Sequence, residues 1–143
     1  MTEDEAARTL EAFLAAHGVR AELGIGRNKI GGVMLGAAEL FFEYESGELR
    51  CHALVYRFRR EPKREVLEAF AQEEGRPGAD TGGGRLEYRP ESRALFLSRA
   101  YTVIIPEADF ARDMKALADA SLLWATEVAG RAADRAFHSE KQD

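Results

Sequence analysis

Hydrophobic positions in the last third of the chain repeat with helical spacing. The stripe consists of Phe110, Met114, Leu117, Ser121, Trp124 and Val128. Steps of three and four residues place such positions on one face of a helix. Pro106 marks the start of this helix, and the stripe loses its period after Gly130. We interpret the helix as the cover of a sheet and Trp124 as a packing anchor.

The N-terminal segment predicts a second amphipathic helix, from Glu3 to His17. Thr2 and Glu5 have the spacing of a capping box, in which each side chain bonds to the backbone of the other residue. The apolar face is formed by Ala6, Leu10, Phe13, Leu14 and His17. Gly18 then suits the left-handed position that commonly ends a helix.

Three strands are predicted next, over 33–37, 40–45 and 49–59, because polar and apolar residues alternate there. Ser46 and Gly47 form the expected hairpin turn between the second and third strands. In the third strand, the set His52, Leu54, Tyr56 and Phe58 is predicted to face the core. The result is an antiparallel meander with one buried and one mixed face.

Pro62 introduces a predicted helix whose apolar face contains Val66, Leu67 and Phe70, and Gly75 ends it. A glycine-rich connection over 76–84 leads to strands 85–89 and 94–105, which are joined by a tight turn at 90–92. The predicted fold class is therefore α+β. One domain over 1–138 has the order helix, three strands, helix, two strands, helix, with the helices packed on an antiparallel sheet, and 139–143 is expected to fray.

Composition agrees with an ordinary globular domain: 45% of the 143 residues are hydrophobic and 31% are charged. The chain has no apolar run near the roughly 18 residues that a membrane span needs. No secretory segment is visible, and the single cysteine, Cys51, cannot form an internal disulfide. We therefore expect a cytoplasmic protein without a membrane partner.

The net charge of -5 is unevenly distributed along the chain. Residues 50–64 contain six basic side chains and one acidic one, whereas both flanking regions are acidic. The arginines alternate with Tyr56 and Phe58, a pattern that also occurs in nucleic-acid-binding strips. We favour solvent-facing strand arginines, because the aromatic side chains point to the opposite face, and expect no nucleic-acid partner.

A glycine-rich stretch, Gly24–Gly32, contains Arg27 and Lys29 as candidate anion-binding residues. Exposed backbone amides with two cations suit a phosphate. However, the third glycine of the dinucleotide fingerprint is missing and no Gly-Lys-Ser/Thr follows. We favour a plain connecting loop and keep a small-ligand or nucleotide-sensing regulatory domain as the alternative function.

No set of residues predicts catalysis, a cofactor or a metal site. The three histidines, His17, His52 and His138, fall on different elements without paired ligand spacing. Cys51 and His52 are adjacent in a strand, so their side chains point to opposite faces and cannot act as nucleophile and base.

The order of elements resembles the class I type III secretion chaperones of bacteria and the wider superfamily that includes YbjN-like proteins. The corresponding features are the glycine-containing stretch and strand Gly82–Pro90, the strand Leu95–Val103, the helix Phe110–Trp124, and Pro62 after the third strand. The resemblance implies a non-enzymatic homodimer that binds an extended segment of a partner protein, with the helix after Pro62 and neighbouring strands at the dimer interface. Val33, Leu35, Phe41 and Val55 are the candidate partner-binding residues.

Overall fold

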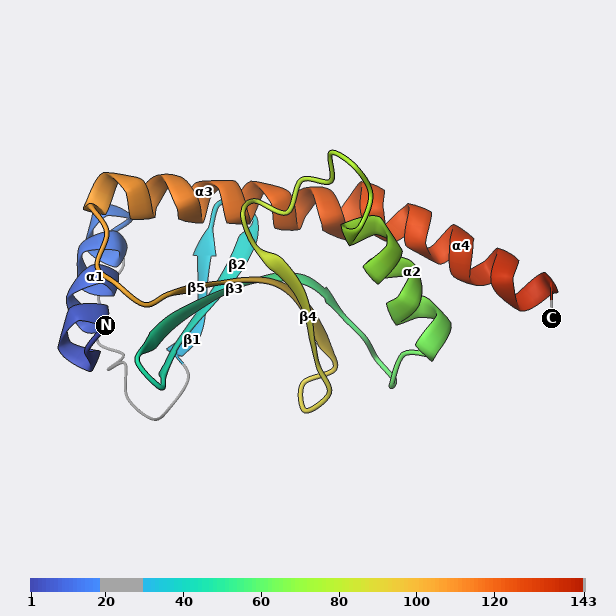
Figure 1. The fold of residues 1–143 in the computed structure, drawn as a ribbon, viewed down its shortest axis with the longest axis horizontal. Coiled ribbons are helices and arrows are strands. Elements are labelled where there is room, and N and C mark those ends of the chain that lie inside the picture. Colours follow the sequence, from blue (N-terminus) through green and yellow to red (C-terminus); the bar gives the residue numbers. More distant parts are fainter. Residues whose placement is uncertain (19–29, 143) are drawn as a thin grey trace.

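The computed structural model describes residues 1–18 and 30–142, and it confirms the predicted α+β class and element order. The elements are α1 (Glu3–Ala16), β1 (Ile30–Leu35), β2 (Ala38–Glu45), β3 (Glu48–Arg57), α2 (Arg64–Glu74), β4 (Arg85–Arg89), β5 (Ala94–Tyr101), α3 (Glu107–Leu123), the π-helical turn η1 (Trp124–Val128) and α4 (Ala129–Gln142). The helix of the apolar stripe thus continues through η1 into α4 (Figure 1).

The five strands form one antiparallel sheet in the order β1-β2-β3-β5-β4. Consecutive strands pair through the hairpins at 46–47 and 90–93, while the crossover from β3 carries α2 before β4 joins the far edge. β1 and β4 are therefore the edge strands, and β3 and β5 lie in the interior.

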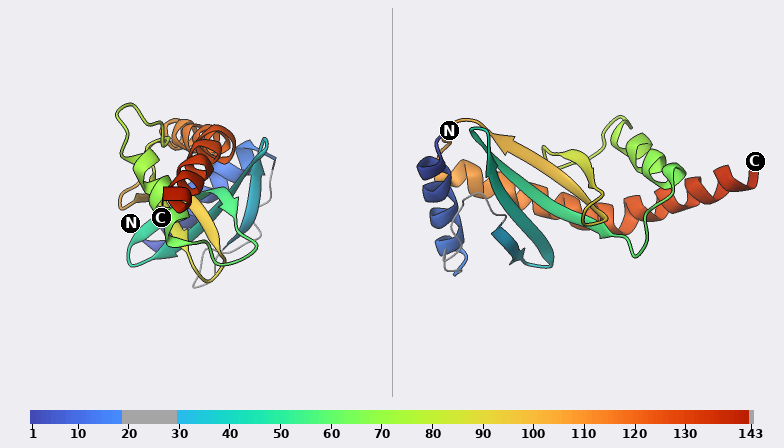
Figure 2. Two further views of the ribbon diagram at one scale, coloured as in Figure 1. Left: turned by 90° about the vertical axis from the view of Figure 1, so that its right-hand side faces the viewer. Right: turned by 90° about the horizontal axis from the view of Figure 1, so that it is seen from below.

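The long helix lies along one face of the sheet, the upper one in Figure 1. α3 contacts β2, β3 and β5, and α1 packs against α3 at one end. α4 continues past the sheet, where α2 packs alongside it (Figure 2). The molecule is thus a helix-covered sheet with a two-helix extension at one end.

The N-terminal capping box is confirmed. The Glu5 amide donates to Thr2 Oγ1 at 3.1 Å, and the Thr2 amide donates to Glu5 Oε1 at 2.9 Å. The face of α1 that contains Leu10 and Phe13 is buried, and the Phe13 ring meets Phe42 and Phe110 edge-on. The first helix is therefore fixed both by its cap and by its contact with the core.

The predicted core face of the third strand is wrong for His52 and Leu54, whereas Phe58 packs against the core as predicted. Leu49, Cys51, Ala53 and Val55 are the residues of β3 that belong to the hydrophobic core. His52 and Leu54 lie on the opposite face. The register shifts between Leu54 and Tyr56, and this shift returns Tyr56 to the side of the core residue Leu95. Small side chains suit the covered face because α3 lies directly against it.

Candidate functional site

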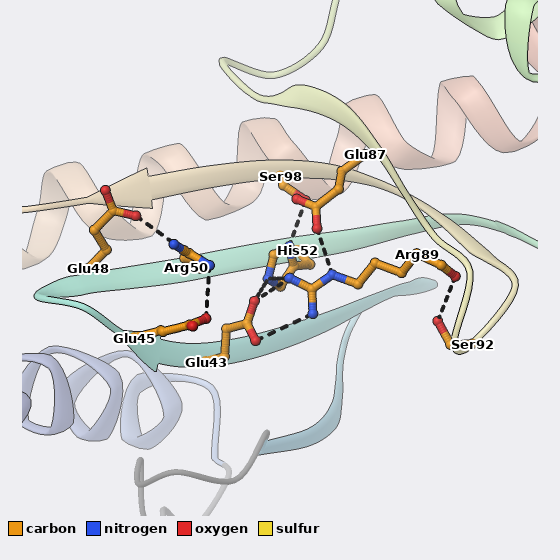
Figure 3. A network of polar contacts seen from close by, with 9 residues as sticks. All are labelled: Glu43, Glu45, Glu48, Arg50, His52, Glu87, Arg89, Ser92 and Ser98. Carbon is orange, nitrogen blue, oxygen red and sulfur yellow. Dashed lines mark hydrogen bonds and ion pairs between the residues drawn. The ribbon is translucent and has the colours of Figure 1, made fainter.

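The sheet face turned away from α3 carries a chain of polar contacts across four strands (Figure 3). Ser98 on β5 lies 2.6 Å from His52 Nδ1, and His52 Nε2 lies 2.7 Å from Glu43 Oε1 on β2. Arg89, on the edge strand β4, reaches across the sheet to pair with Glu43 and also with Glu87, whose Oε1 accepts from its Nε at 2.6 Å. The network connects β2, β3, β5 and β4.

The protonation of the network follows from its partners. Burial disfavours the charged form of His52, which is only 3% exposed, and neighbouring Arg89 adds to this, so the pKa of His52 is lowered. Burial alone would raise the pKa of Glu43, but hydrogen bonds from Arg89 and His52 outweigh it and hold that pKa at about 2. At neutral pH the network therefore contains a neutral imidazole beside an arginine–carboxylate pair.

A serine, a histidine and a carboxylate in contact invite comparison with nucleophilic catalysis. Two features oppose it. Arg89 lies 3.1 Å from His52 Nε2 and lowers the basicity of the imidazole. Ser98 lies on an interior strand paired on both sides, with His52 and with Arg85, so the strand backbone offers no free pair of amides for an oxyanion. The geometry favours a network that fixes strand register.

Cys51 lies on the helix-covered face, opposite His52, as the alternation along the strand predicts. Burial raises the pKa of its thiol well above the usual range. A buried, protonated thiol is a poor nucleophile. The two side chains therefore form no catalytic pair.

Within residues 1–18 and 30–142, no group of three histidine, cysteine or carboxylate side chains is placed to hold a metal ion. The same stretch contains no helix with both the length and the apolar character required to cross a bilayer.

The four predicted partner-binding residues do not share one surface. Val33 and Val55 are buried members of the core beneath the helices, and the partly buried Leu35 packs against the same core. Phe41 lies on the opposite sheet face, partly buried, with its ring 5.7 Å from that of Phe96. The predicted anion-binding pair, Arg27 and Lys29, lies outside the described residues.

The contact between α2 and α4 depends on a charge cluster that the sequence analysis missed. Glu73 on α2 is buried, and its Oε2 accepts from Arg76 at 3.1 Å and from Arg131 on α4 at 3.3 Å. Arg135 lies 3.4 Å from the other oxygen. Burial opposes ionisation of Glu73, but the hydrogen bonds from Arg76 and Arg131 lower its pKa. Glu73 lies three residues after Phe70, and this spacing could have predicted that Glu73 shares the buried face of α2.

No protein-family model matches the chain, and no curated protein matches it. Among solved structures, the chain is similar in fold to a chain of the crystal structure of the ExsC–ExsE complex, with a TM-score of 0.65 and 11% sequence identity. The match covers 86% of this chain and 92% of the other. At this level of identity the likeness shows a shared fold, in agreement with the fold predicted from the order of elements.

Proposed function

We propose that this protein is a non-enzymatic, cytoplasmic binding module that holds an extended segment of a partner protein and acts as a homodimer. One observation carries the proposal. The fold matches a chain of a two-protein complex over 86% of its length. Many functions share one fold, so a binding module of this kind also requires a surface that can receive such a segment.

The outer edge of β1 is that surface. β1 pairs only with β2, so the opposite side of its backbone is unpaired within the sheet. An extended peptide can add to such an edge through backbone hydrogen bonds and place alternate side chains on each sheet face. Met34, which is 56% exposed, lies beside this edge, and Leu35 is partly exposed on the other face. We propose Leu35 and Phe41 as the predicted residues that contact the partner.

The proposal is tested in two stages. In the first stage, affinity capture with this protein from the native host is expected to recover a partner. In the second stage, the partner is shortened to its binding segment, which is purified and added to this protein. Amide hydrogen exchange of Ile30–Leu35 should slow on binding, because strand addition protects edge amides. Light scattering should give about twice the 15.9 kDa chain mass.

Matched charge substitutions sharpen the test. Met34→Glu should abolish binding of the segment, while Leu122→Glu, at another exposed position on α3, should leave it intact. Repeated capture without any partner, together with a monomeric mass, would count against the function. A partner whose binding leaves the β1 amides unprotected would count against the edge.

A further inference from the structure

An apolar groove of about 380 Å³ lies between α2 and α4, where they extend past the sheet. Its walls come from Tyr56 at the end of β3 and Phe58 just beyond it, from α2 (Val66, Phe70) and from α4 (Ala133, Phe137). Tyr56 is 46% exposed and Phe137 is 54% exposed. Two large aromatic side chains exposed on one concave surface are typical of a binding site rather than of scattered surface residues.

The chain segment beside this groove is strongly basic. Residues 57–64 contain five basic side chains and one acidic one, a net charge of +4, in a chain whose net charge is -5. The one acid, Glu61, accepts a hydrogen bond from the Tyr88 hydroxyl at 3.0 Å. Arg57, Arg59 and Arg60 are exposed, and none of the three has an ion-pair partner among the described residues. The groove thus has an apolar floor, and Arg59 and Arg60 beside it in the chain are exposed without an ion-pair partner among the described residues.

We propose that this groove binds an acidic amphipathic helix of the partner protein. The inference rests on the proposed function and adds a second contact to it. Apolar side chains of the helix fill the groove, and its carboxylates face Arg59 and Arg60, which follow Phe58 in the chain. Complementary charge of this kind raises the association rate and selects the partner.

A helix fits this groove better than an extended strand. β3 is an interior strand paired with β2 and β5, so its backbone offers no free edge beside the groove. Only side chains are available for contact. The α4 wall runs from Ala129 to Phe137, which corresponds to about two helical turns. Alanines along this wall allow close approach of a third helix with apolar anchors at three- and four-residue spacing.

A second copy of this chain is a poorer occupant of the groove, so the homodimer predicted to form through α2 and neighbouring strands would use a surface of α2 other than Val66 and Phe70. A two-fold interface brings the same patch of both subunits together. Here it would place two segments of net charge +4 against each other. Like charges facing one another across an interface weaken association.

The probe is a fluorescent, acetylated peptide of about 14 residues, which gives roughly four helical turns. Leucines occupy one face at three- and four-residue spacing, and glutamates occupy the rest. A matched peptide carries lysine in place of every glutamate. Anisotropy titration of the full-length protein should show at least about tenfold tighter binding of the glutamate peptide. That preference should shrink as salt screens the charges. Equal affinities for the two peptides, or no binding of the acidic one, would overturn the inference.

Two substitutions on α4 localise the site. Ala133→Gln adds volume to an exposed wall position and should weaken peptide binding at least about tenfold. Gly130→Gln is the control, because Gly130 has open space around it and lies outside the groove. The double substitution Arg59→Ala/Arg60→Ala should lower affinity for the acidic peptide and leave the basic peptide unaffected.

Other outcomes separate the two proposals. Unchanged affinity in Ala133→Gln would remove the groove as the site. A halved molecular mass in Ala133→Gln would show that a second copy occupies it, and would also overturn the inference. If the partner segment still slows amide hydrogen exchange in β1 after either result, the proposed function stands and only the helix site fails.

Discussion

At the scale of single residues, the polar network on the sheet face illustrates how charge can be buried in a small domain. Glu43 and Arg89 come from strands separated by two others, and His52 lies between them. An unpaired buried charge is strongly destabilising, whereas a paired and hydrogen-bonded one is tolerated. Because Glu43, His52 and Arg89 come from three different strands, their contacts are made in one register only.

The network predicts a specific dependence of stability on pH. The pKa of Glu43 falls from 4.5 to about 2 on folding. The unfolded chain therefore binds more protons at Glu43 than the folded one between these values, so the contribution of Glu43 to stability is complete above pH 4.5 and is lost as pH falls towards 2. The lowered pKa of His52 also makes the protein less stable in acid. Its contribution to the free energy of unfolding begins to fall as the pH drops below 6.5, the ordinary pKa of the group.

Replacement of Glu43 by Gln tests this account. The variant should lose roughly 3 kcal/mol of unfolding free energy at pH 7. Its stability should then change less than that of the wild type between pH 4.5 and 2, as measured by urea unfolding. Glu45→Gln, on the same strand with a side chain that is 63% exposed, should change neither quantity appreciably. Parallel pH curves for Glu43→Gln and the wild type would contradict the proposed charge state.

At the scale of elements, the connection into β4 depends on close backbone contact with α3. A Cβ added at Gly82 would lie 2.4 Å from the Ala116 carbonyl oxygen and 2.7 Å from Leu117 Cα. Gly82 also has a φ of +63°, in the left-handed region. Glycine is therefore required at position 82 for two reasons: the backbone is left-handed there, and a side chain would clash with the backbone of α3.

Two glycine substitutions separate these roles. Gly78 has a φ of +78° but nothing within 4 Å of its Cβ position, so Gly78→Ala should lower the unfolding free energy by only about 1 kcal/mol of backbone strain. Gly82→Ala adds a clash with helix backbone and should lose at least about 2 kcal/mol more. Chemical denaturation measures both. Equal losses would mean that the loop moves away from α3 without penalty.

The sequence predicted where helices and strands lie better than it predicted which face of a strand is buried. Alternation and caps were enough to locate most of the strands and to place the start of α1, since both are local properties. The core face of β3 was misassigned because the register shift after Leu54 and the small residues under α3 are consequences of packing. Arg89 and Glu43 are 46 residues apart, so their contact required the strand order, which no local pattern contains.

At the scale of the whole molecule, Trp124 lies where the sheet cover meets the α2–α4 extension. Its indole Nε1 donates to the Asp80 carbonyl at 2.8 Å, and its ring stacks on Phe70 with centroids 6.4 Å apart. Trp124 also begins the π-helical turn η1, through which α3 continues into α4. Since only 1% of this residue is exposed, it is the packing anchor expected from the apolar stripe.

Because Trp124 packs against both parts, we predict that the sheet and the α2–α4 extension unfold together as one cooperative unit. Fluorescence of this single tryptophan and far-ultraviolet circular dichroism should report the same urea midpoint. Trp124→Ala, followed by circular dichroism, should lose roughly 3–5 kcal/mol in one transition, because it removes a large buried ring shared by both parts. Leu122→Ala, two positions earlier at an exposed site, should lose no more than about 0.5 kcal/mol. Separate midpoints, or a loss in Trp124→Ala no larger than that of Leu122→Ala, would mean that the extension folds independently of the sheet. The groove between α2 and α4, which we propose as a helix-binding site, would then have no fixed shape.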